Sequence, residues 1–118
     1  MTYLAPLHTV VETPEYLAAA DRAGMTEEER DAALDILQRN PGAGDIVPDT
    51  GGCRKVRVPR AGGGKSGGYR VITYYTDMDN PVILLTVISK GKQANLTDGQ
   101  KQAVRGTAKT EKKRRKRK

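Results

Sequence analysis

The chain has 118 residues and a formal net charge of +7, with 21 lysines and arginines against 14 acidic residues. Its size predicts one small domain, and its single cysteine excludes an internal disulfide. No cluster of cysteine and histidine suggests a metal site. The first ten residues have neither a basic start nor a long apolar run, so we expect no signal peptide or membrane span there and a cytoplasmic protein.

The charge is distributed unevenly along the chain. Residues 1–49 have a net charge of −7, whereas residues 50–76 carry +6 and the last seven residues carry +7. Positive charge concentrated on a segment that should form rigid strands is typical of a surface that holds a polyanion. RNA is the first candidate.

The N-terminal half predicts an edge strand followed by two helices. Residues 7–11 suit the strand. Thr13 before a proline starts the first helix and Gly24 ends it. A capping box at residues 26–29 starts the second helix, which ends before the Asn-Pro-Gly sequence that begins at Asn40. Residues 41–52 are expected to form a loop.

Alternating polar and apolar residues then predict three strands. Val56 and Val58 share one face of the first of these, so its basic residues point the other way. The next strand covers residues 69–75. Residues 82–89 are apolar at both odd and even positions, which is typical of a central strand covered on both sides. Pairing the valine face with the helices places four side chains on one open face: Lys55, Arg57, Arg70 and Tyr74.

A second capping box at residues 97–100 predicts a short helix to about Arg105. We expect residues 1–108 to form the domain and residues 109–118 to be a disordered basic tail. The tail has three interpretations: a solvated run, a nucleic-acid tether or an address signal. We favour an electrostatic aid to RNA or ribosome binding. The fold class is α+β, a small, mostly antiparallel sheet with an N-terminal helical hairpin packed on one face.

These residues resemble a known family. The segments GDIVPDTGGCRKVRV and GKSGGYRVITYY, with an apolar strand that ends in a lysine, resemble the RelE superfamily of bacterial toxins, and most closely its HigB-like branch. The resemblance implies a microbial-RNase-like fold. It also implies a metal-independent, cofactor-free endoribonuclease of a type II toxin–antitoxin system that cleaves mRNA on the ribosome. The implied partner is a cognate helix-turn-helix antitoxin, and operator DNA is contacted only through the complex with it.

The resemblance also implies the site. The catalytic candidates are Lys55, Arg57, Arg70, Lys90 and Tyr74. The RNA-binding candidates come from the basic segment and the end of the last strand: Arg54, Arg60, Lys65 and Lys92. The two strand arginines suit bidentate contacts to phosphate, and the neighbouring lysine is a candidate general base. Classical members place a tyrosine in the C-terminal helix; this chain has none after Tyr75, so Tyr74 is the substitute. The sequence leaves open whether its ring packs in the core or stacks on a base.

Other interpretations remain beside this one. The lysine in GGGKS does not belong to a phosphate-binding P-loop, because Pro59 stands where that motif needs glycine and a strand follows instead of a helix. His8 and Cys53 are expected to have no chemical role. The alternative function is a catalytically inactive RelE-fold module that binds nucleic acid or protein.

Overall fold

The computed structural model describes residues 7–62 and 67–116. Within them five strands and three helices form an α+β fold, which confirms the predicted class. The elements in chain order are β1 (Val10–Glu12), α1 (Pro14–Ala23), α2 (Glu27–Arg39), β2 (Asp45–Ile46), β3 (Arg54–Val58), β4 (Tyr69–Tyr74), β5 (Val82–Ser89) and α3 (Asp98–Lys116). No helix in these ranges is long and apolar enough to cross a bilayer.

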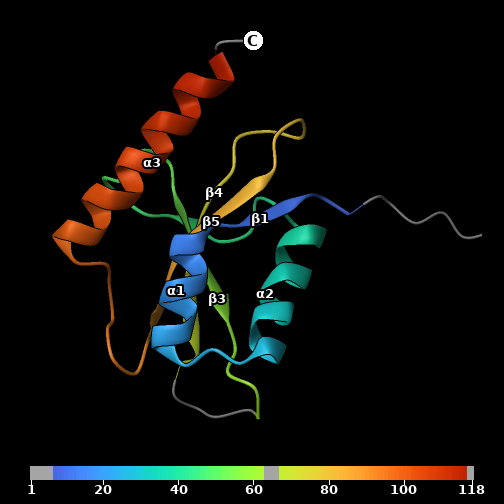
Figure 1. The fold of residues 1–118 in the computed structure, drawn as a ribbon, viewed down its shortest axis with the longest axis vertical. Helices are drawn as coiled ribbons and strands as arrows, with labels where there is room; N and C mark the ends of the chain where they lie inside the picture. Colours follow the sequence, from blue (N-terminus) through green and yellow to red (C-terminus); the bar gives the residue numbers. More distant parts are fainter. Residues whose placement is uncertain (1–6, 63–66, 117–118) are drawn as a thin grey trace, which may run out of the picture.

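The strands form one mixed sheet in the order β1-β5-β4-β3-β2. β1 is an edge strand and runs parallel to β5, while the other three pairings are antiparallel, as a mostly antiparallel sheet requires. α1 and α2 lie side by side over one face of this sheet (Figure 1). Within the loop expected over residues 41–52, Asp45 and Ile46 form the two-residue strand β2. The sequence does not indicate this strand, because the segment is rich in glycine, proline and aspartate and carries no strand pattern.

The helical hairpin begins and ends where its capping residues predict. The hydroxyl of Thr13 accepts the N–H of Tyr16 at 3.0 Å and donates to the carbonyl of Leu84 at 2.7 Å, so the cap also ties α1 to the central strand. Thr26 and Glu29 form the reciprocal capping box of α2. Gly24 closes α1 with φ +79°, a conformation in which a side chain is strained.

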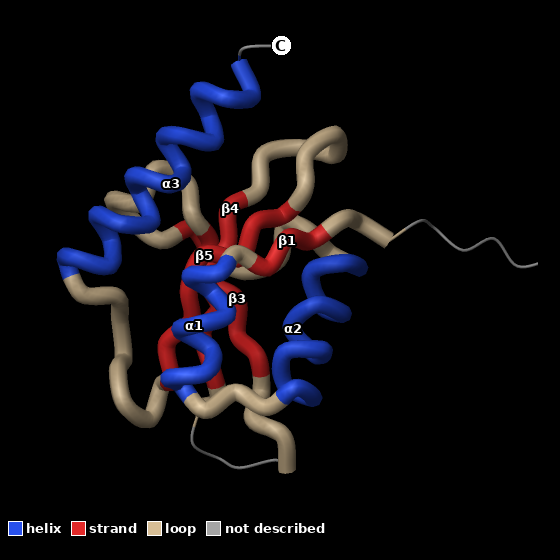
Figure 2. The backbone as a smooth tube through the Cα atoms, in the orientation of Figure 1, coloured by secondary structure: helices blue, strands red, loops and turns tan. Residues whose placement is uncertain are grey.

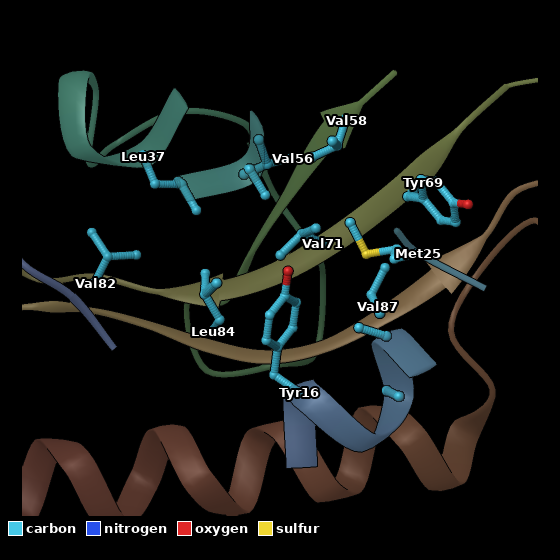
Figure 3. Close-up of a cluster of buried hydrophobic side chains, with 13 residues drawn as sticks. Tyr16, Met25, Leu37, Val56, Val58, Tyr69, Val71, Val82, Leu84 and Val87 are labelled. Carbon is cyan, nitrogen blue, oxygen red and sulfur yellow. The ribbon is translucent and has the colours of Figure 1, made fainter. Parts of the chain in front are cut away.

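The main core lies between this hairpin and the sheet. Side chains of α1, α2 and one face of the central strands meet there and are almost completely buried (Figure 3). The labelled members include Tyr16, Leu37, Val56, Val71 and Leu84. Val56 and Val58 face the helices, as the alternation predicts.

A second core covers part of the opposite face of the sheet. Val104 and Ala108 of α3 pack with Ile72 and Leu85, and residues of the loop before β3 complete the cluster. The predicted end of this helix near Arg105 is wrong: α3 continues to Lys116, into the segment expected to be disordered. Its last turns extend beyond the sheet (Figure 2). The extension has a physical reason, since Ala108 is completely buried in the second core and anchors the turn beyond Arg105.

Candidate active site

Two arginines from neighbouring strands form the centre of the candidate site. Arg57 of β3 lies directly opposite Arg70 of β4 in the antiparallel ladder, so both side chains project from the same face of the sheet. Lys55 lies two residues before Arg57 and shares this face. Arg57 is exposed, and the other two are half-buried. The structure thus brings together three of the five predicted catalytic residues.

These side chains border a recess of about 550 Å³ at the outer edge of β3. The recess exists because β2 pairs only with Arg54 and Lys55, which leaves β3 without a strand partner on this side from Val56 onward. The lining residues are Ile36, Ala43, Gly44, Asp45, Lys55, Val56, Arg57 and Arg70. Gly44 has φ +92°, and a Cβ there would collide with the carbonyl of Lys55, so glycine is required at this wall.

Asp45 is a site residue that the sequence analysis missed. It lies opposite Lys55 in the β2–β3 pair and lines the recess beside the arginines. The basic segment contains no acid along the sequence, and the short strand β2 brings this carboxylate in from outside it. The sequence contains this aspartate in the GD dipeptide of the GDIVPDTGG segment, but the pairing of Asp45 with β3 depends on the tertiary structure.

Lys90 lies near the arginine pair, at the end of β5. Its backbone N–H donates to the carbonyl of Gly68 at 3.1 Å, and its side chain packs against Gly67. Arg70 donates from Nη1 to the carbonyls of Gly67 and Tyr69, at 3.1 and 3.3 Å. Gly67 therefore contacts both cations, and Lys90 is placed to extend the site.

The three predicted RNA-binding residues that the structure describes do not gather there. Arg54 donates to the carbonyl of Gly44 at 3.1 Å and so holds the loop before β2. Arg60 lies over the ring of Tyr69, 5.0 Å from its centroid, on the helical side of the sheet. Lys92 lines a separate hollow with residues of α1 and α3. Lys65 lies outside the described residues.

The predicted position of Tyr74 on the open face is wrong. Tyr74 does point to the same side of the sheet as Arg70, but only 1% of it is exposed. At that end of the face, α3 and the loop before β3 cover the strands. The alternation of the strand determines which way Tyr74 points and cannot reveal what covers it.

Glu29 connects the site's glycine-rich loop to α2. One carboxylate oxygen accepts the N–H of Thr26 at 2.9 Å, and the other accepts the N–H of Ala61 at 2.7 Å. Burial alone would raise the pKa of Glu29, but these backbone hydrogen bonds hold it below its usual value. Burial and the hydrogen bond to Glu29 raise the pKa of Tyr69. Glu29 thus anchors the first residues of the loop that leads to Arg70.

His8 and Cys53 lie apart from the arginine pair. The His8 ring nitrogen Nε2 is 2.7 Å from the carbonyl oxygen of Asn80, and the ring packs edge-on against Tyr75. Cys53 is completely buried in the second core, and burial raises the pKa of its thiol. Within residues 7–62 and 67–116, no three histidine, cysteine, aspartate or glutamate side chains converge on one point.

The fold thus has a helical hairpin on one face of a small sheet, and two paired arginines on the part of the other face that α3 leaves open. Residues 19–118 match the family model described as the RelE toxin of the RelE / RelB toxin-antitoxin system, so the chain belongs to the RelE toxin family. It is therefore the toxin of a toxin–antitoxin pair, and an antitoxin partner goes with that class.

The fold also resembles a solved structure. The E. coli toxin RelE, a double arginine-to-alanine mutant in the free state, superposes with a TM-score of 0.52 at 17% sequence identity. The match covers 75% of this chain and 88% of the E. coli chain. At this identity the likeness supports the shared fold.

Proposed function

We propose that this toxin is a metal-independent endoribonuclease that cleaves mRNA on the ribosome. The observation that carries the proposal is the cross-strand pair of Arg57 and Arg70 beside an open recess. Two guanidinium groups on one face suit the oxygens of a single phosphodiester, which each can bind bidentately. Membership of a toxin family supports an RNA backbone as the target.

The reaction needs only groups that this chain supplies. The ribose 2′-oxygen attacks the adjacent phosphorus, the 2′-O–P bond forms and the P–O5′ bond breaks. The 2′-hydroxyl loses its proton to a base, and the departing 5′-oxygen gains one from an acid. The phosphorane formed between these steps carries additional negative charge, which Arg57 and Arg70 stabilise.

Two side chains compete for the role of base. Lys55 borders the recess and accepts a proton only in its neutral form. Asp45 lies opposite Lys55 and carries a carboxylate, which is also a proton acceptor. If Asp45 is the base, protonated Lys55 or Lys90 supplies the proton for the leaving oxygen. Asp45→Asn and Lys55→Ala distinguish these assignments by their cleavage rates as a function of pH.

The ribosome supplies positioning in this proposal. A site that relies on cations has little machinery to orient the 2′-oxygen for in-line attack, and orientation is worth up to about 7–11 kcal/mol in aligned reactions. The antitoxin is proposed to be a helix-turn-helix protein, with operator DNA contacted only through the complex, as the resemblance to the HigB-like branch implies.

The test maps mRNA ends. Translating ribosomes are incubated with the intact chain, with Lys55→Ala/Arg70→Ala, and with the charge-matched control Arg22→Ala/Arg39→Ala. Both control arginines are exposed on the helical hairpin. Primer extension should reveal new 5′ ends with the intact chain and the control and none with the site variant. Equal cleavage by the site variant would refute the assignment, and reactions without ribosomes test the dependence on them.

A second function is favoured by one observation. Tyr74, the substitute for the family's tyrosine, is buried and cannot reach a substrate in the recess. The alternative is therefore a catalytically inactive RelE-fold module that grips RNA or a partner protein. This alternative predicts that the intact chain binds ribosomes or RNA and leaves no new 5′ ends.

A further inference from the structure

The helix α3 carries a row of cations that the site does not use. Lys101, Arg105, Lys109 and Lys112 follow one another at spacings of four, four and three residues, which keeps them on one side of the helix. We call these four residues the α3 stripe. It spans about 16 Å at the rise of an α-helix. Arg105, Lys109 and Lys112 are exposed, and Lys101 is half-buried.

The acids of the helix do not neutralise this row. After Asp98 the only acid of α3 is Glu111, which is 8% exposed and ion-paired with Arg114. Like charges four residues apart destabilise a helix. The helix dipole does not account for the stripe either, because Lys101 lies near the N-terminus of α3, where a cation is unfavourable. The stripe thus opposes helix stability in isolation, as a surface that binds an anion does.

The stripe lies on the same side of the sheet as the candidate active site. α3 packs against the second core, which shares its face of the sheet with Arg57 and Arg70. Arg105 donates from Nε to the carbonyl of Asp49 at 2.8 Å, so the stripe borders the loop that leads into β3. A polyanion held at the arginine pair and one held by α3 would approach the protein from one side.

A membrane surface does not fit the stripe. An interfacial helix needs a free apolar face beside its cations. Of the apolar residues of α3, Val104 and Ala108 are buried in the second core, which leaves Ala103 as the one exposed. A helix with cations and no free apolar face suits the phosphates of a nucleic acid. Lysine and arginine bind these phosphates without recognising the base sequence.

We propose that the α3 stripe is a second RNA-binding surface, which holds the phosphate backbone of RNA beyond the cleaved linkage. The choice of RNA over DNA rests on the proposed function. Lys90 and the arginine pair bind the scissile region, while the stripe adds affinity that is independent of sequence and steeply dependent on salt.

The test measures binding without cleavage. A 2′-O-methyl RNA of about 16 nucleotides has no free 2′-hydroxyl and cannot be cleaved by internal attack, while its phosphates match those of RNA. Fluorescence anisotropy compares the full chain, Lys109→Gln/Lys112→Gln and the charge-matched control Arg22→Gln/Arg39→Gln between about 50 and 200 mM salt. Glutamine is a good helix former, and circular dichroism checks that α3 remains helical.

The stripe variant should bind several-fold more weakly than the control. Its plot of log affinity against log salt should be shallower by about 1.4, since two phosphate contacts are lost at about 0.7 each for single strands. Equal affinity and slope in the two variants would overturn the proposal. So would an undetectable interaction of the intact chain with the RNA at low salt. A DNA duplex of equal length is titrated in parallel, and a loss of affinity confined to this duplex would also overturn the proposal.

Failure of this proposal is separate from failure of the proposed function. The binding assay uses RNA that cannot react, whereas the cleavage assay uses ordinary mRNA. A chain that cleaves mRNA but shows no stripe effect overturns only the second RNA surface. A chain that shows the stripe effect and does not cleave mRNA overturns only the proposed endoribonuclease activity.

Discussion

The two ends of one sheet face are used differently in this protein. At one end, Ile72, Tyr74 and Leu85 are buried beneath α3 and the loop before β3. At the other end, Arg57 and Arg70 stand opposite each other beside an open recess. The strands and their alternation are the same at both ends, so the coverage by other elements decides which end packs and which end can bind a substrate.

The largest effect is expected at the open end. On the proposed mechanism, Arg57→Ala should lower the rate of mRNA cleavage about 10²–10³-fold, because it removes one of two donors to the phosphorane. Arg57 is exposed, so the free energy of unfolding should change by no more than about 0.5 kcal/mol. Arg22→Ala is the control and should cleave normally. A variant that retains full cleavage would remove Arg57 from the site.

The covered end should show the reverse pattern. Leu85→Ala removes a side chain that is 6% exposed in the second core and should lower the free energy of unfolding by about 2–5 kcal/mol. Denaturant titration measures this loss. Cleavage per folded molecule, measured at a temperature where the variant is still folded, should stay unchanged. A specific loss of cleavage would show that the two ends are coupled.

Glu29 on the helical side tests how much its two backbone hydrogen bonds stabilise the fold. Glu29→Gln leaves one oxygen acceptor for the N–H groups of Thr26 and Ala61, so a buried donor loses its partner. The expected cost is about 1–3 kcal/mol of unfolding free energy. Chemical denaturation measures this cost. The control is Gln38→Glu, which introduces a carboxylate in place of an amide at a half-buried position of the same helix.

The same carboxyl predicts a pH dependence. The pKa of Glu29 is lower in the folded chain than in the unfolded chain, so its stabilisation is present above the unfolded value and is lost as pH falls through the folded value. The intact chain should therefore lose part of its stability below about pH 4.5, and Glu29→Gln should lose less. Parallel losses in both proteins would contradict the assignment.

The smallest effect is expected for Tyr74→Phe. The hydroxyl is buried under the covered end, so its removal should leave mRNA cleavage unchanged and alter the free energy of unfolding by about 1 kcal/mol or less. Cleavage assays and denaturant titration on one preparation measure both. A large loss of cleavage with normal stability would restore Tyr74 as a catalytic residue and contradict its burial.

Local signals in the sequence were sufficient for much of the fold. The caps at Thr13 and Thr26 and the turn at Gly24 predicted the hairpin, because each satisfies backbone groups within a few residues. The alternation in residues 54–58 predicted which side chains face the helices, because strand geometry reverses direction at every residue. Lys55, Arg57 and Arg70 were placed on one face by the same rule.

Contacts between distant residues decided the remainder. Asp45 joins the site only through a two-residue pairing, and Tyr74 leaves it because α3 and the loop before β3 cover it. The extension of α3 beyond Arg105 depends on burial of Ala108 in the second core. By itself the sequence determined the helical hairpin, the strands other than β2, the direction of their side chains and the sign of the charge. The tertiary structure decided which charged surface stays open, because coverage depends on packing between segments that are far apart along the chain.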